Sequence, residues 1–142
     1  MRAMSTSAAP DRNQQEAPPA NGEPLAGRRV LIVEDDPFIA MAVEETLVDF
    51  GLTIAGVARN LREAVHLAKV ADFDIALLDV NIGHETIDGV AEAVDARGKP
   101  FVFTTGHGRA GLPEAYRERA IVEKPFYVDE ILNALRAELG LT

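Results

Sequence analysis

The sequence contains no cysteine among its 142 residues. This absence excludes disulfides, thiolate zinc sites and thiol nucleophiles together, and it leaves carboxylates and three histidines as candidate metal ligands. Because carboxylate oxygens prefer hard cations, a metal site in this chain is expected to hold an ion such as Mg²⁺.

Long apolar runs and basic clusters are also missing. No run approaches the roughly 18 residues needed to cross a bilayer, and the N-terminus does not resemble a secretory signal. We therefore expect a cytoplasmic protein that does not contact membranes. The fourteen Lys and Arg residues are scattered and outnumbered by acids, giving a net charge of -9. Such a surface repels a phosphate backbone, so direct nucleic-acid binding is not expected.

The chain length and its 47% apolar content predict a single domain with an ordinary core. Residues 1–27 are rich in proline and small polar residues, and Leu25 is their one large aliphatic residue besides methionine. Such a segment buries too little surface to offset its ordering entropy. We expect residues 1–27 to form a disordered tail and residues 28–142 to form the domain.

From residue 28 onward, short apolar runs alternate with segments of helical period, a pattern typical of βα units and a parallel sheet. Five units fit. The predicted strands cover 30–33, 53–57, 75–78, 101–104 and 120–123, and the predicted helices cover 37–50, 60–69, 86–97 and 128–139. Asp36 with Pro37, and Asn60 with Glu63, are typical of helix starts.

The fourth unit is the exception. Three glycines and Pro113 lie within residues 106–113, and glycine costs a helix about 1 kcal/mol per position relative to alanine. The sequence therefore predicts a mobile loop followed by one or two turns over 113–119 in place of a full fourth helix.

Polar side chains follow the predicted strands, where an open parallel α/β sheet binds ligands. Carboxylates brought close together there repel one another unless a cation neutralises them, and Mg²⁺ suits such a group. Asp79 then has the geometry of a nucleophile for a phosphoryl group, with Lys124 and Mg²⁺ taking up charge and a threonine hydroxyl donating to the same group. The residues at these strand ends are Glu34, Asp35, Asp36, Asp79, Thr104, Thr105 and Lys124.

Four segments together resemble the signature blocks of response-regulator receivers, and the resemblance covers residues 28–140. It implies a flavodoxin-like, doubly wound sheet of five parallel strands in the order 2-1-3-4-5. The segments are Leu31-Ile32-Val33-Glu34-Asp35-Asp36-Pro37, Leu77-Leu78-Asp79-Val80-Asn81, Thr105-Gly106 and Glu123-Lys124-Pro125-Phe126.

The resemblance also implies roles for individual residues. Asp79 matches the phosphoacceptor, and a histidine kinase is the implied donor. Glu34 and Asp35 match the acidic pair at the metal, and the backbone carbonyl of Asn81 matches a further ligand. Two residues match the groups that contact the phosphate: Thr105 the switch hydroxyl, and Lys124 the lysine whose bond to Pro125 is often cis.

Two departures concern the switch. Ile121 stands where many receivers carry a Tyr or Phe that swings inward on activation. Residues 103–107 with 112–113 resemble the FATGUY class of alphaproteobacterial single-domain receivers, although Thr104 replaces the usual Ala and His107 the usual aromatic residue. This class implies an HWE or HisKA-2 kinase and a role in stress signalling. His107 then tunes dephosphorylation or is an exposed loop residue.

Other functions of this fold fit the sequence less well. A haloacid-dehalogenase phosphatase needs an acid where Asn81 stands, and a flavodoxin needs hydroxyls where Glu34 and Asp35 stand. A receiver-fold binding module that signals without phosphorylation stays open. Because only three residues follow Leu139, we expect output through protein contact, and no enzyme activity beyond the domain's own phosphorylation and dephosphorylation. A phosphorelay intermediate that passes the group to a phosphotransferase, and a phosphate sink, are equally compatible.

Overall fold

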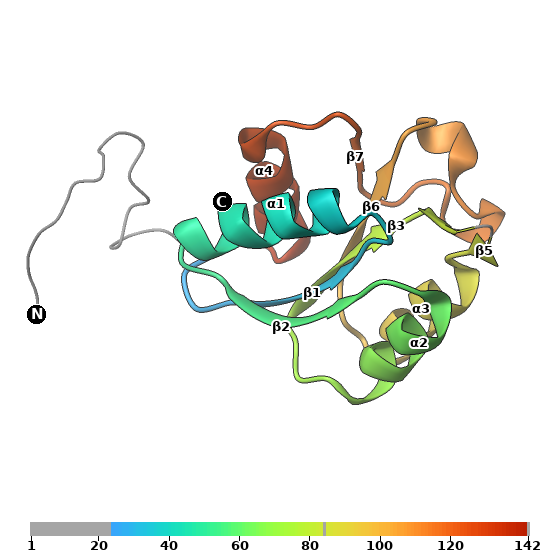
Figure 1. The fold of residues 1–142 in the computed structure, drawn as a ribbon, viewed down its shortest axis with the longest axis horizontal. Coiled ribbons are helices and arrows are strands. Elements are labelled where there is room, and N and C mark those ends of the chain that lie inside the picture. The colour runs from blue at the N-terminus through green and yellow to red at the C-terminus, as the bar shows by residue number, and fades with distance from the viewer. Residues whose placement is uncertain (1–23, 84, 142) are drawn as a thin grey trace, which may run out of the picture.

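The fold is known from a computed structural model, which describes residues 24–83 and 85–141. Five strands form one parallel sheet in the order β2-β1-β3-β6-β7 (Figure 1). Counted along the five βα units this is the order 2-1-3-4-5, so the predicted fold class is confirmed. The strands of this sheet are β1 (Arg29–Val33), β2 (Thr53–Ala58), β3 (Ile75–Asp79), β6 (Phe101–Thr105) and β7 (Ile121–Glu123).

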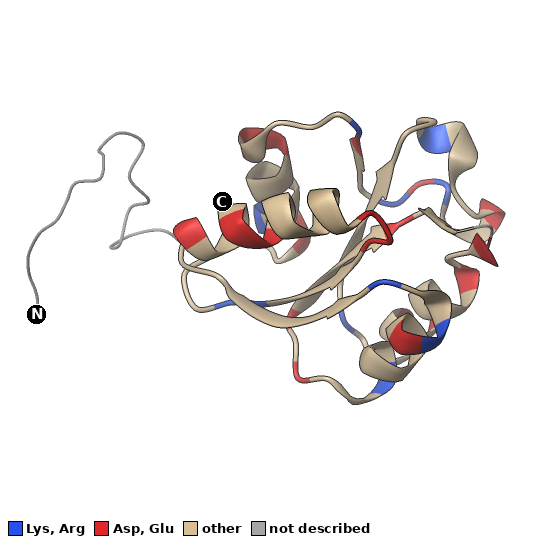
Figure 2. Ribbon diagram, in the orientation of Figure 1, with Lys and Arg blue, Asp and Glu red and all other residues tan. Residues whose placement is uncertain are grey.

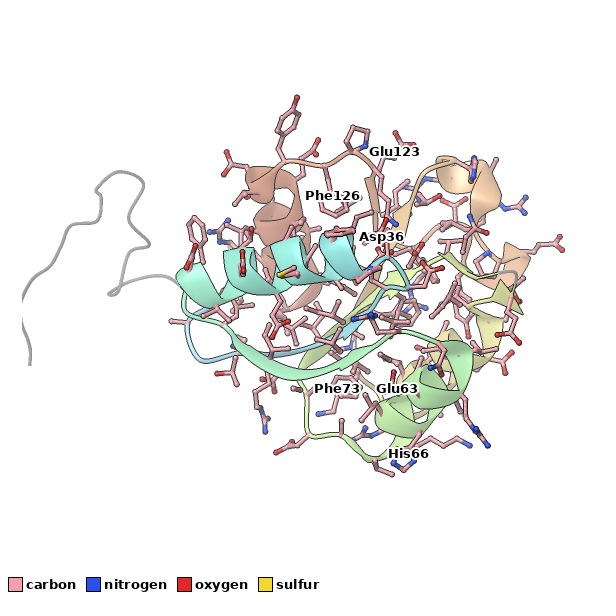
Figure 3. The ribbon with its side chains drawn as sticks, in the orientation of Figure 1. Asp36, Glu63, His66, Phe73, Glu123 and Phe126 are labelled. Atoms are coloured by element: carbon pink, nitrogen blue, oxygen red, sulfur yellow. The ribbon has the colours of Figure 1, made fainter. Side chains whose placement is uncertain are left out.

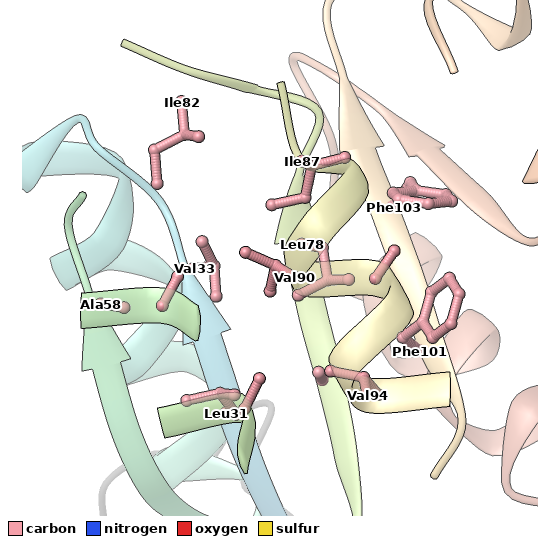
Figure 4. Packing of buried hydrophobic residues seen from close by; sticks show 14 of the residues in the cluster. Leu31, Val33, Ala58, Leu78, Ile82, Ile87, Val90, Val94, Phe101 and Phe103 are labelled. Atoms are coloured by element: carbon pink, nitrogen blue, oxygen red, sulfur yellow. The ribbon is translucent and has the colours of Figure 1, made fainter. Parts of the chain in front are cut away.

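Helices cover both faces of the sheet (Figure 1). Helices α1 (Pro37–Asp49) and α4 (Val128–Glu138) pack on one face, and α2 (Leu61–Val70) and α3 (Asp88–Ala96) on the other. Successive strand residues point to opposite faces, so Leu31 packs toward α2 and α3 (Figure 4) while Ile32 packs toward α1 and α4. This two-sided burial explains why the strands read as continuous apolar runs.

Local capping positions the first two helices, as the sequence predicts. The Asp36 carboxylate accepts from the N–H groups of Phe38 at 2.9 Å and Ile39 at 3.3 Å. Asn60 accepts from the Glu63 N–H at 2.8 Å. These bonds satisfy donors that the first helical turn leaves without intrahelical partners, so the start of α1 is fixed directly after the acidic residues that follow β1.

The segment after β3 differs from the prediction. A two-stranded antiparallel hairpin, β4 (Asn81–Ile82) with β5 (Glu85–Thr86), precedes α3. The helix predicted over 86–97 therefore begins at Asp88 and ends at Ala96. Ile82 and Ile87 are both buried (Figure 4), and their packing holds this segment as a hairpin where helical spacing alone suggested a longer helix.

The fourth unit contains two short 3₁₀ helices, η1 (Arg109–Gly111) and η2 (Glu114–Tyr116), in place of a full helix. This agrees with the expected short fourth helix, and the mobility of the loop stays a prediction. The Arg109 guanidinium donates to the carbonyls of Arg117 at 3.1 Å and Arg119 at 2.7 Å. These bonds tie the start of the segment to its return toward β7.

The packed domain begins before the predicted boundary at residue 28. Leu25 is fully buried in the cluster beneath α1 and α4, and the Gly27 N–H donates to the Gly51 carbonyl at 2.8 Å. An isolated apolar residue in a polar segment gave no periodic signal, which is why the sequence assigned it to the tail. The predicted disorder of residues 1–23 lies outside the described residues. Across 24–83 and 85–141, no helix has the length and apolar character needed to cross a membrane.

Candidate functional site

Three carboxylates meet at the carboxyl ends of β1 and β3. Glu34 and Asp35 follow β1, and Asp79 is the last residue of β3. One oxygen from each lies within 4.8 Å of the others. Acidic segments of the ribbon meet at this edge of the sheet (Figure 2). Asp36, the fourth acid named by the sequence, is exposed and serves as the cap of α1, so it is not part of this cluster.

Lys124, which follows β7, bridges two of these carboxylates. Its Nζ lies 2.9 Å from Glu34 Oε1 and 3.3 Å from Asp79 Oδ2. Its backbone N–H donates to the Thr105 carbonyl at 2.8 Å, which extends the β6–β7 pairing up to the site. The Lys124–Pro125 peptide bond is cis. The structure therefore brings together residues from three strands that are distant in the sequence.

Burial and charge shift the protonation of this cluster. Glu34 is 4% exposed, and burial raises its pKa to about 7. The charge of Asp79 contributes to this increase, and the hydrogen bond from Lys124 opposes it. For Lys124 burial lowers the pKa, but the hydrogen bond and charge of Glu34 and the charge of Asp79 outweigh it, so the net shift is upward. The ammonium therefore stays charged at neutral pH.

The donor set fits a hard divalent cation. Three carboxylates facing one ammonium leave an excess of negative charge, and a cation among them would relieve the repulsion that raises the Glu34 pKa. All the available donors are oxygens, which Mg²⁺ prefers. Asn81 lies beside the cluster, where its N–H donates to Asp79 Oδ1 at 3.1 Å. The metal-binding role of its carbonyl stays a prediction.

The Asp79 carboxylate is almost covered. The Asp79 side chain is 5% exposed, and the Lys124 side chain that contacts it is 22% exposed. Lys124 is therefore the more exposed member of this contact.

The Thr105 hydroxyl is turned toward the glycine-rich loop. Thr105 is fully buried, and its Oγ1 accepts from the His107 N–H at 3.0 Å and donates to the Gly108 carbonyl at 3.4 Å. His107 itself is exposed in this loop, and Ile121 is partly buried against the core beside α2 and α3. The position of the missing aromatic switch thus holds a packed aliphatic side chain, and the hydroxyl is the group that connects to the loop.

An apolar groove between α1 and α4 lies beside the carboxylates and was not predicted. It has a volume of about 510 Å³, and Phe38, Phe126 and Val128 contribute to its walls. Phe126 lies over the start of α1 (Figure 3), and Phe38 is 78% exposed. Lys124 lines the groove as well as contacting Asp79. Phe38 falls within the helix predicted over 37–50, and nothing in the sequence distinguished its exposed side chain from the buried apolar residues of that helix.

Comparison with known proteins gives consistent matches. The response regulator receiver domain family matches residues 30–136. Transcriptional regulatory protein PdtaR of Mycobacterium tuberculosis is 32% identical over 122 residues, which cover 83% of this chain and 60% of that protein. Chemotaxis protein CheY of Thermotoga maritima is 32% identical over 114 residues, which cover 77% of this chain and 95% of that protein. The chain thus spans less than two thirds of PdtaR and nearly all of CheY.

Solved structures show the same fold. SdrG from Sphingomonas melonis Fr1 has a TM-score of 0.71 at 38% identity, covering 81% of this chain and 98% of SdrG. The anti-anti-sigma factor PhyR from Bartonella quintana has a TM-score of 0.69 at 28% identity, covering 80% of this chain and 48% of PhyR. The similarity to PhyR is therefore confined to about half of that protein.

Proposed function

Because this chain belongs to the response regulator receiver domain family, we propose that it accepts a phosphoryl group on Asp79 from a histidine kinase in a Mg²⁺-dependent reaction. The observation that carries the proposal is the convergence of Glu34, Asp35 and Asp79 within 4.8 Å, with Lys124 bridging two of them. Glu34, Asp35 and Asp79, with the Asn81 carbonyl, would hold the ion. Bound Mg²⁺ would neutralise the carboxylates and polarise the phosphoryl oxygens.

In the proposed transfer, an Asp79 oxygen attacks phosphorus. The bond from phosphorus to the kinase histidine breaks, and the histidine keeps the electron pair. Lys124 already donates to Asp79 Oδ2, so it stands where negative charge gathers on the phosphoryl oxygens. We propose no catalysis beyond this self-phosphorylation and the later hydrolysis of the group, in which water attacks phosphorus and the bond to the Asp79 oxygen breaks.

The phosphorylated state would act through Thr105. New phosphate oxygens are strong acceptors, and a Thr105 hydroxyl that turns toward them gives up its bonds to His107 and Gly108. This releases the loop over 106–113 and changes the surface offered to a partner protein. With Ile121 in the aromatic position, this hydroxyl is the proposed link to the loop, and His107 is the proposed tuner of dephosphorylation.

The groove between α1 and α4 is the proposed contact surface for the kinase. A kinase histidine must approach Asp79 directly, and Lys124 belongs to both the groove and the acceptor site. An apolar surface rimmed by exposed Phe38 suits a helix with an apolar face. An HWE or HisKA-2 kinase, and stress signalling in the cytoplasm, are proposed from the resemblance of residues 103–107 to the FATGUY class, and the similarity to the anti-anti-sigma factor PhyR agrees with a protein partner. The domain would act through a partner protein, in a phosphorelay or as a phosphate sink.

Incubation with Mg²⁺ and acetyl phosphate, followed by mass spectrometry of the intact protein, tests the proposal. We expect the mass of one phosphoryl group to be added to the wild type and to Asp36→Asn, since asparagine also caps helices. Asp79→Asn should show no gain, and chelation of Mg²⁺ should abolish the gain in the wild type. No gain from acetyl phosphate or from a phosphorylated kinase would instead identify a phosphorylation-independent binding module.

A further inference from the structure

The β4–β5 hairpin is anchored next to the carboxylate cluster. Asn81 pairs with Thr86, and Ile82 pairs with Glu85. Ile82 and Ile87 hold the hairpin at both ends in the core beneath α2 and α3 (Figure 4). Because Ile82 and Ile87 are both fixed by apolar packing, strands β4 and β5 are held in a defined position beside the core.

Two backbone amides of this hairpin reach the carboxylates. The Asn81 N–H donates to Asp79 Oδ1 at 3.1 Å, and the Gly83 N–H donates to Asp35 Oδ2 at 2.8 Å. Over residues 24–83 and 85–141, Gly83 is the one hydrogen-bond donor found on the Asp35 side chain. Glu34, in contrast, is held by both Lys124 and the Asp36 N–H. The orientation of Asp35 therefore depends on a residue 48 positions away in the sequence.

The turn conformation selects glycine at this position. Gly83 has φ of +65°, in the left-handed region that side chains other than Asn and Asp rarely adopt. No atom lies within 4 Å of where a Cβ would stand. Backbone conformation, rather than space, therefore limits this residue, and a substitution that resists the left-handed region would turn the amide away from Asp35.

We propose that Gly83 is a positioning residue for the metal site: its amide fixes one oxygen of Asp35 so that the carboxylate presents its other oxygen to the ion. The proposal rests on the metal-binding role of Asp35 in the proposed function. Groups that orient metal ligands commonly change metal affinity by 10- to 100-fold. The coupling is reciprocal, so an ion held by Asp35 also stabilises the hairpin.

Mg²⁺ titration by calorimetry of the full chain tests this role with three variants. Gly83→Val disfavours the left-handed conformation, whereas Gly83→Asn tolerates it and keeps the N–H. Gly98→Val is the matched control, because Gly98 has φ of +70° and equally open surroundings at the end of α3. We expect Gly83→Val to bind Mg²⁺ about tenfold more weakly than Gly98→Val, and Gly83→Asn to stay within about twofold of the wild type.

Amide hydrogen exchange of the wild type gives a second readout that needs no variant to fold. Because the coupling is reciprocal, saturating Mg²⁺ should slow amide exchange in the β4–β5 hairpin about tenfold, the factor expected for the Mg²⁺ affinity of Gly83→Val. Equal Mg²⁺ affinity of Gly83→Val and Gly98→Val, or unchanged hairpin exchange, would overturn the positioning role. Asp35→Asn and Asp79→Asn separate the two proposals. If both bind Mg²⁺ like the wild type, the proposed metal site is wrong. If both lose affinity but Gly83→Val does not, the metal site stands and only the positioning role of Gly83 fails.

Discussion

The Lys124 ammonium lies 2.9 Å from the Glu34 carboxylate, and the two side chains are 22% and 5% exposed. Lys124 is the one cationic side chain in contact with Glu34 in the part of the chain that the structure describes. The same ammonium reaches Asp79 at 3.3 Å. One lysine thus joins the ends of β1, β3 and β7, and its removal would leave two nearly buried acids facing each other.

Lys124→Met should therefore destabilise the metal-free protein. Breaking a buried pair costs about 3–5 kcal/mol, and the partial exposure of Lys124 reduces the expected loss to about 2 kcal/mol. Urea unfolding in chelator, at a pH above the Glu34 pKa of about 7, measures this loss. Adding Glu34→Gln to Lys124→Met removes one of the two orphaned charges, and with it their repulsion, and should restore much of the stability. A Lys124→Met protein as stable as the wild type would contradict this account of the pair.

Thr105→Val should loosen the glycine-rich loop before any phosphorylation. The substitution keeps the shape of the side chain and removes the oxygen that accepts from the His107 N–H at 3.0 Å. We expect a loss of about 1 kcal/mol in unfolding free energy, and faster amide exchange at His107. Thr104→Val is the matched control, since the Thr104 side chain points to the opposite face of the sheet. If the two variants gave the same exchange rate at His107, the hydroxyl would not be holding the loop.

The parts of the fold that sequence reasoning predicted are those with local causes. Asp36 and Asn60 cap helices through hydrogen bonds to residues two or three positions away. The strands are predicted by their continuous apolar runs. The β4–β5 hairpin was missed because its strands have two residues each, too few for a period. Leu25 was missed because its burial depends on a long-range cluster.

The candidate site divides in the same way. The strand-end rule and the family resemblance together named Glu34, Asp79 and Lys124, which the structure places in contact. The Gly83 amide on Asp35 could not be predicted, because a backbone donor carries no side-chain signal. Phe38 lies in the helix predicted over 37–50, and its 78% exposure was not predicted. Periodicity identifies an apolar face, but it does not say whether the rest of the domain or a partner covers that face.

Asp74→Asn should make stability less dependent on pH in acid. The Asp74 carboxylate accepts from the Arg29 backbone at 2.8 Å and from its guanidinium at 3.0 and 3.3 Å. These hydrogen bonds lower the Asp74 pKa below its ordinary value of 3.8. A lowered carboxyl pKa contributes stability that is fully present above 3.8 and is lost as the pH falls through the folded-state value.

Urea unfolding from neutral pH downward measures this contribution. The wild type should exceed Asp74→Asn by about 1 kcal/mol at neutral pH, because the pair is partly exposed. The difference should shrink below pH 3.8. Asp72→Asn is the control, since Asp72 pairs with the same arginine but is 82% exposed, and its effect should be close to zero. A constant difference between the wild type and Asp74→Asn at every pH would show that ionisation of Asp74 is not the cause.

Phe38→Ala should separate kinase docking from phosphoryl chemistry. Phe38 lines the groove between α1 and α4. Its phenyl side chain takes no part in the ion pair between Lys124 and Asp79. We expect kcat/KM for transfer from the phosphorylated kinase to fall about tenfold, as for an interface aromatic residue contributing about 1.4 kcal/mol. The rate of phosphorylation by acetyl phosphate should not change, because this small donor needs only the carboxylate cluster.

Val48→Ala is the control on the same helix. Val48 is 53% exposed and does not line the groove, so its loss should affect neither donor. An equal fall with both donors in Phe38→Ala would mean that the side chain supports the fold of the site rather than the kinase contact. Unchanged transfer from the kinase would exclude the groove as its docking surface. Only a selective loss with the kinase would support docking in the groove. Lys124 is the one groove residue with an ion pair to Asp79 among the described residues, so it connects the groove to the carboxylate cluster.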